Sequence, residues 1–144
     1  ALEIEDLAGY FPTTVDANLT VAARQVAGKL VAPEEMIERG HGTGSTDLGD
    51  LGALMPVIET SVGGIQGGLH SADYKAAKPE ISCLLGAKFL AGMALELLAE
   101  DAALARKAVD EYKPIFSSKE EYFAFADSLF CRKTIPGGGW QWDE

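Results

Sequence analysis

The feature that most constrains the fold is a long apolar segment, Ile81 to Ala99, in a chain of 144 residues. It carries Lys88, Glu96 and two glycines, so it lacks the unbroken apolar composition of a membrane-spanning helix. Pro79, just before it, is favourable in the first turn of an α-helix. Because apolar side chains lie on most sides, we predict a helix to about Glu100 that is buried between a sheet and other elements.

Further helices are predicted on either side of this segment. Asp16 has the side chain of an N-cap and precedes an amphipathic pattern to about Leu30. The long helix is predicted to continue as a more charged helix from Asp101 to Tyr112. Ser118 with Glu121 has the spacing of a capping box, which predicts a helix through about residue 130.

Strands are predicted at three short segments. Residues 2 to 5 alternate apolar and acidic side chains, Met36–Ile37 is a short apolar pair, and Val57 to Val62 is rich in β-branched residues. Strands that alternate with helices predict an α/β fold, yet a typical sheet has about five or six strands. We therefore predict helices packed on a partial β-sheet, with the remaining strands in another chain or in an upstream segment.

Two glycine-rich stretches, residues 40–50 and 63–68, lie close to predicted strands. Glycine lets the backbone approach a ligand closely or adopt positive φ, and α/β proteins place their sites at strand ends. Neither stretch has the GxxxxGK[ST] pattern or a GxGxxG that opens a helix, so neither is a phosphate-binding loop. Their spacing alone is equally compatible with ordinary turns.

His70 follows the second glycine-rich stretch, and His41 lies in the first. Imidazole is the commonest protein ligand for zinc, manganese and related ions, but one histidine does not make a site. Asp47 and Asp50 are three residues apart and could share one helical face. The interpretation that we favour for them is an N-terminal cap and a first-turn acid of a short helix.

The order of these motifs resembles a known family. Residues 44–50 (Gly-Ser-Thr-Asp-Leu-Gly-Asp) and 68–74 (Gly-Leu-His-Ser-Ala-Asp-Tyr) are similar to the C-terminal part of the aminoacylase and carboxypeptidase G superfamily of metallopeptidases. The likeness is greatest to the amidohydrolases that include aminobenzoyl-glutamate hydrolase and the indole-acetyl-amino-acid hydrolases. It also takes in residues 9–12 (Gly-Tyr-Phe-Pro) and 111–114 (Glu-Tyr-Lys-Pro), so it covers most of the chain.

The resemblance implies a role for individual residues. A histidine at the position of His70 is the family's last metal ligand, for a divalent zinc or manganese. Gly44, Ser45 and Thr46 correspond to a segment near the substrate's carboxylate, and we include His41 with them as a substrate-binding residue. In the family a metal-activated water attacks an amide carbonyl, with a glutamate as general base. That glutamate and the other ligands come from an N-terminal portion that no residue here matches, so no residue of this chain is assigned a catalytic role.

The resemblance also implies a domain organisation. Residues 1–13 correspond to the end of a lid domain and its connector, residues 14–131 to the C-terminal part of a zinc-peptidase-like catalytic domain, and residues 132–144 to a tail. The missing N-terminal catalytic portion lies in the same chain or in another one. Because the family often dimerises through its lid domain, we expect a homo-oligomer when the protein is complete.

Composition limits the partners. Twelve basic against twenty-two acidic residues give a net charge of -10, which disfavours nucleic acid and anionic membrane surfaces. The two cysteines, Cys83 and Cys131, form no CxxC pair and fit a reducing compartment, so we expect a cytoplasmic protein. The predicted function is hydrolysis of a small amide or dipeptide-like substrate. The alternative is a non-catalytic assembly or regulatory subunit that retains this segment of the fold.

Overall fold

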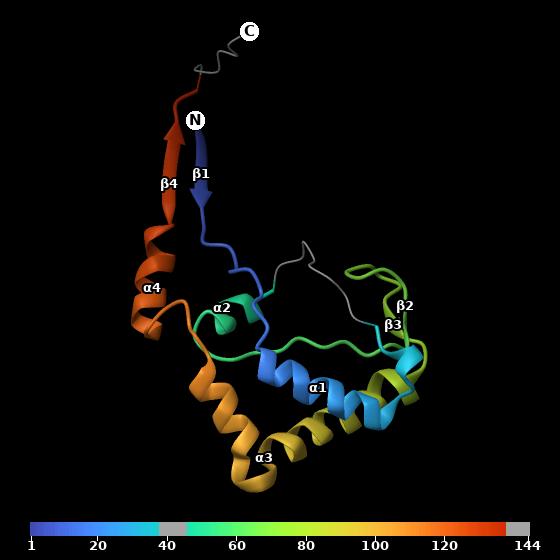
Figure 1. The fold of residues 1–144 in the computed structure, drawn as a ribbon. Coiled ribbons are helices and arrows are strands. Elements are labelled where there is room, and N and C mark those ends of the chain that lie inside the picture. The colour runs from blue at the N-terminus through green and yellow to red at the C-terminus, as the bar shows by residue number, and fades with distance from the viewer. Residues whose placement is uncertain (38–45, 138–144) are drawn as a thin grey trace.

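A computed structural model of the chain describes residues 1–37 and 46–137 (Figure 1). Its centre is the pair of helices α1 (Ala17–Leu30) and α3 (Gly86–Glu111), and a ribbon of strands β1 (Leu2–Asp6) and β4 (Cys131–Ile135) projects from one end. The other elements are η1 (a 3₁₀ turn, Pro33–Glu35), α2 (Leu48–Gly52), β2 (Ile65–Gln66), β3 (Lys75–Ala76), η2 (a π-helical turn, Glu80–Leu85) and α4 (Lys119–Ser128). The chain is therefore a mixture of helices and strands, and its described sheets are small and antiparallel.

The helix α1 begins where its sequence predicts. The side chain of Asp16 accepts a hydrogen bond from the backbone N–H of Leu19 at 2.8 Å, which confirms the predicted N-cap. The backbone N–H of Asp16 donates to the carbonyl of Val57 at 2.8 Å. This bond joins the start of α1 to the segment that follows α2.

The core lies between α1 and α3. Its buried members are Ala22, Ala23 and Val26 of α1 and Met93 of α3. Gly92 permits the close approach, because a Cβ there would lie 2.6 Å from Cγ1 of Val26. The helices of this chain thus pack mainly against each other rather than on a sheet.

Much of α3 is exposed, so the prediction of a fully buried helix is wrong for the described chain. Leu90, Leu95 and Leu98 are each about 70% exposed or more (69%, 75% and 70%), because only one face of α3 meets α1. Among the described residues, Glu80–Glu111 is the one helical segment long and apolar enough to span a bilayer, a test that core helices of soluble proteins also pass.

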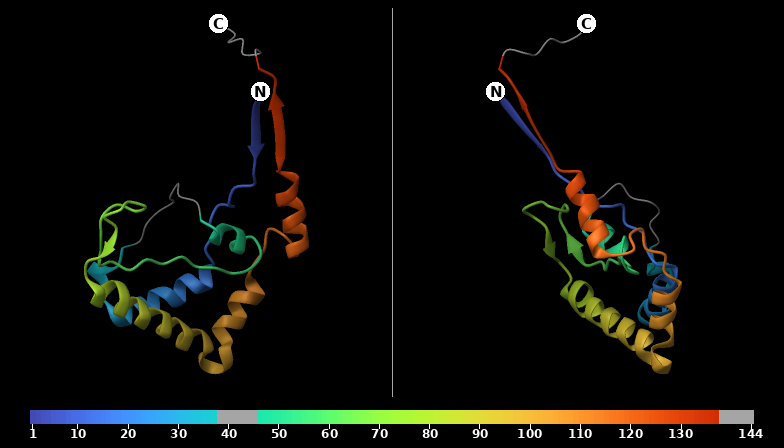
Figure 2. Two further views of the ribbon diagram at one scale, coloured as in Figure 1. Left: turned by 180° about the vertical axis from the view of Figure 1, so that it is seen from behind. Right: turned by 90° about the vertical axis from the view of Figure 1, so that its left-hand side faces the viewer.

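The helix α3 is sharply bent at residues 99–102 (Figure 2). Glu100, Asp101 and Ala102 have φ values of 49°, 59° and 58°, which lie in the left-handed region. For residues other than glycine this conformation costs roughly 1–2 kcal/mol each. The two helical segments predicted on either side of residue 100 therefore meet at this bend.

The strand predictions are confirmed in part. β1 forms as predicted, and it pairs in antiparallel register with β4, from Leu2 opposite Ile135 to Asp6 opposite Cys131. The β4 strand lies almost wholly in the segment predicted as a tail. Met36–Ile37 and Val57–Val62 are not strands, because within the described residues neither segment has a neighbouring strand to pair with.

An aromatic cluster anchors α4 to the rest of the chain. The rings of Phe11, Phe116, Tyr122 and Phe125 have neighbouring centroids 5.4 to 6.1 Å apart. The predicted cap of α4 is confirmed, because the Ser118 hydroxyl accepts from the N–H of Glu121 at 3.2 Å. The reciprocal bond differs from a capping box: the Glu121 carboxylate accepts from the N–H of Ser117 at 2.9 Å.

Candidate metal and substrate site

The predicted metal ligand, His70, lies in the loop that joins β2 to β3, a hairpin that stands away from the helices (Figure 1). The loop folds tightly on itself at Gly67, whose φ is 92°. A Cβ at Gly67 would lie 2.4 Å from the carbonyl oxygen of Asp73, so both the conformation and the space require glycine. The glycine-rich stretch therefore has a structural role, because Gly67 allows the hairpin loop to form.

His70 also has a positive φ, 64°. Histidine adopts this region more often than most residues other than glycine. Two backbone bonds fix the loop around it: the N–H of Ser71 donates to the carbonyl of Gly68 at 3.0 Å, and the N–H of Tyr74 donates to the carbonyl of Ser71 at 3.1 Å. The His70 side chain is exposed, so its imidazole is accessible from solvent.

Asp73, three residues after His70, is the nearest acidic residue along this loop. The Ser71 hydroxyl donates to Oδ1 of Asp73, and this hydrogen bond is the main reason why the pKa of Asp73 lies below its ordinary value of 3.8. The same hydroxyl lies 2.6 Å from the Gly68 carbonyl oxygen. The bond favours the ionised carboxylate, so its contribution to the hairpin is present above the ordinary pKa and is lost as the pH falls through the lowered one.

We expect Ser71→Ala to raise the pKa of Asp73 towards 3.8, because the largest cause of the lowering is removed. Carboxyl carbon shifts followed by NMR through an acid titration measure this directly. Ser82→Ala is the matched control, because the Ser82 hydroxyl donates to the Lys78 carbonyl and lies near the Cys83 sulfur rather than a carboxylate in the part of the chain that the structure describes. An Asp73 titration identical in the two variants would show that the bond is not formed in solution.

Of the predicted substrate-binding residues, Thr46 is described, whereas His41, Gly44 and Ser45 lie outside the described residues. The Thr46 hydroxyl donates to Oδ1 of Asp47 at 3.1 Å, and its carbonyl accepts from the N–H of Gly49 at 3.1 Å. Thr46 therefore lies just before the N-terminal end of α2, where its carbonyl accepts a bond from the first turn.

The acidic residues of α2 serve the fold. Asp47 occupies the N-cap position of this short helix as predicted, but its side chain makes no capping hydrogen bond. Asp50 lies in the first turn as predicted, and its carboxylate accepts from the N–H of Phe11 at 3.0 Å. Burial and the neighbouring Asp50 raise the pKa of Tyr122. Asp50 thus connects α2 to the chain that follows β1.

The described members of the two predicted parts of the site, Thr46 and His70, lie on separate stretches of the chain. Figure 1 and the left view of Figure 2 place α2 and the β2–β3 hairpin at opposite ends of the extended segment that connects them. Thr46 lies two residues before α2, and His70 lies in the loop of the hairpin. A common site would need a surface that spans both.

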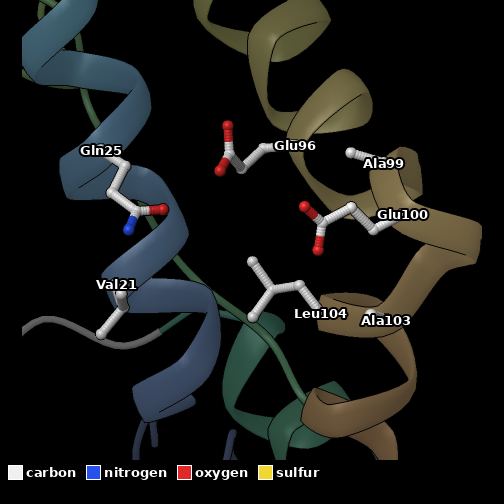
Figure 3. Close-up of a pocket in the computed structure, with 7 residues that line it drawn as sticks. All are labelled: Val21, Gln25, Glu96, Ala99, Glu100, Ala103 and Leu104. Atoms are coloured by element: carbon white, nitrogen blue, oxygen red, sulfur yellow. The ribbon is translucent and has the colours of Figure 1, made fainter.

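A pocket that the sequence did not predict lies between α1 and the bend of α3 (Figure 3). It has a volume of about 280 Å³, and the side chains of Gln25, Glu96 and Glu100 approach it. Glu96 is paired with Lys29, with Nζ and Oε2 2.8 Å apart. The remaining lining residues are Val21, Ala99, Ala103 and Leu104. Sequence reasoning missed this pocket because it depends on the bend.

The donors near His70 do not by themselves fit a metal ion. Among residues 1–37 and 46–137, no group of three or more histidine, cysteine, aspartate or glutamate side chains is placed to hold a cation. A catalytic zinc needs three protein ligands and a water. No protein-family model, curated protein or solved structure matches this chain. A functional assignment therefore has to rest on the motifs and on the hairpin that carries His70.

Proposed function

We propose that this chain is the C-terminal segment of a metal-dependent amidohydrolase of the cytoplasm. The complete protein would hydrolyse N-acyl or aminoacyl amide bonds of small, dipeptide-like substrates and would form a homo-oligomer. His70 would be one ligand of a divalent zinc or manganese. The loop with Gly44, Ser45 and Thr46, together with His41, would contact the substrate's carboxylate.

The observation that carries this proposal is that His70 is exposed on an ordered hairpin loop. A tight loop, fixed by Gly67 and by backbone hydrogen bonds, holds an exposed imidazole away from the packed helices. Metal sites commonly take a histidine whose backbone is held in place while its ring remains free to coordinate. The motif of residues 68–74 lies on that same loop.

In this proposal the chain supplies only part of the catalytic site. One matched histidine cannot supply the three ligands of a catalytic zinc, and the general base is also missing. The exposed apolar face of α3 is compatible with a segment that requires a further part to complete its domain.

We expect the isolated 144-residue chain to show neither amide hydrolysis nor tight, stoichiometric zinc binding at neutral pH. The complete protein should hydrolyse N-acyl amino acids, lose that activity on chelation, and regain it with zinc or manganese. Calorimetric titration of the chain with zinc, alongside hydrolysis assays of the complete protein, measures both. Tight zinc binding by the isolated chain, or full activity of the chelated complete protein, would contradict the proposal.

The alternative is a non-catalytic assembly or regulatory subunit, and one observation favours it: the apolar face of α3 that is exposed along Leu90, Leu95 and Leu98. Large exposed apolar surfaces commonly mark interaction sites. The upstream reading frame distinguishes the two. A His-x-Asp or Cys-x-His motif with paired glutamates supports the enzyme, whereas a short self-contained frame supports the subunit.

A further inference from the structure

The bend of α3 is formed by residues that have no local reason to bend. The segment Ala99–Ala102 contains no glycine or proline, and alanine and glutamate are strong helix formers. Sharp bends in helices almost always have a proline, a glycine–serine pair, a π-bulge or an inserted group as their cause. Here Glu100, Asp101 and Ala102 are left-handed, and the ion pair of Arg106 with Asp101 at the bend is exposed and therefore weak, so the bend depends on further contacts.

Those contacts lie in the part of α3 that follows the bend. Leu104 packs against the core formed by α1 and α3, and Ala108 is only 1% exposed. At the end of α3, Oε2 of Glu111 accepts from the side-chain amide of Asn18 at 3.0 Å, and the Tyr112 hydroxyl donates to the Gly52 carbonyl. The bent form is thus stabilised by tertiary contacts and opposed by the backbone conformation at the bend.

We propose that residues 99–102 are a hinge about which α3 exchanges between the bent form and one continuous helix. Straightening would relieve the left-handed residues and extend the intrahelical hydrogen bonds, at the expense of the contacts of Leu104, Ala108 and Tyr112. The proposal is independent of the amidohydrolase assignment, because it concerns residues of the helix pair alone.

The hinge would control the pocket between α1 and α3. The pocket is lined by Glu96 and Ala99 before the bend and by Ala103 and Leu104 after it (Figure 3). Both sets face α1 only while the helix is bent. In the continuous form the residues after the bend would move away from α1, so the pocket would open.

Electron paramagnetic resonance distances test the hinge in the full 144-residue chain. Spin labels at Leu95→Cys and Val109→Cys, both exposed positions, flank the bend, with Cys83 and Cys131 replaced by serine. A continuous helix places these two Cα atoms about 21 Å apart, at 1.5 Å per residue. We expect this distance together with a shorter one that represents the bent form.

Glycine at the hinge should shift the two populations. Glu100→Gly, and separately the pair Glu100→Gly with Ala102→Gly, should raise the ratio of bent to continuous helix at least about fivefold, because glycine tolerates the left-handed region and weakens a helix interior. Both variants keep Asp101, which pairs with Arg106 in the bent form. Ala103→Gly is the control: it lies just outside the bend and is helical in both forms, so its ratio should match the parent chain. A single distance in the parent chain, or equal ratios in hinge and control variants, would overturn the proposal.

Discussion

Replacing His70 by alanine in the complete protein should lower kcat/KM for amide hydrolysis by at least about 100-fold and reduce the bound metal. The magnitude follows from metal sites in general, in which loss of a residue that merely orients a ligand already costs about 10- to 100-fold. His70 is exposed in the β2–β3 loop, so its removal should not disturb the packed helices. Steady-state kinetics and metal analysis of the purified protein measure the two effects.

Leu69→Ala is the matched control for this experiment. Leu69 is the neighbouring residue of the same loop and is 72% exposed, but its side chain has no atom that can bind a metal. Its replacement should leave activity and metal content close to those of the parent protein. If His70→Ala kept its activity and its metal, or if Leu69→Ala lost them equally, His70 would not be a ligand.

The helices were predictable wherever their signals are local. Asp16 caps α1 through Leu19, three residues away, and Ser118 caps α4 through Glu121 at the same spacing. The information needed for each cap is contained within one helical turn. For the same reason the predicted and observed starts of these helices agree.

Strand pairing was less predictable, because it depends on partners that are distant in the sequence. β1 pairs with β4 across almost the whole chain, and the sequence Cys-Arg-Lys-Thr-Ile of β4 has no clear alternation of apolar and polar residues. Val57–Val62 has the better strand composition, yet it is not a strand, since nothing in the described residues pairs with it. β-propensity describes compatibility with a sheet and does not supply the neighbouring strand.

The candidate site was predictable as a position in the sequence but not as an arrangement. The glycine-rich stretch before His70 correctly indicated a tight loop, and Gly67 does require glycine. The separation of α2 from the hairpin and the pocket at the bend of α3 both result from tertiary contacts. No pattern at residues 99–102 signals a bend, because all four residues are compatible with a helix.

The largest effect on stability is expected at Gly49, where α2 meets the connector that follows β1. A Cβ at Gly49 would lie 1.7 Å from the carbonyl oxygen of Phe11 and 2.6 Å from its carbonyl carbon. Both are backbone atoms, so a change of rotamer cannot relieve the overlap. Gly49→Ala should therefore lower the free energy of unfolding by about 3 kcal/mol, the upper part of the range for overpacked sites. The corresponding fall in Tm is roughly 10 °C.

Gly28→Ala is the control for this experiment, because here the added methyl group has room. Gly28 is exposed within α1, and a Cβ there would meet nothing within 4 Å. This substitution should raise the free energy of unfolding by about 0.5–1 kcal/mol, because alanine favours the helix interior. Thermal and urea unfolding compare the two variants, and hydrogen exchange at the Phe11 N–H, which donates to Asp50, locates the damage in Gly49→Ala. If Gly49→Ala were as stable as the parent chain and this N–H stayed protected, the contact between α2 and the connector would not exist in solution, and the aromatic cluster around Phe11 would have to be held together without it.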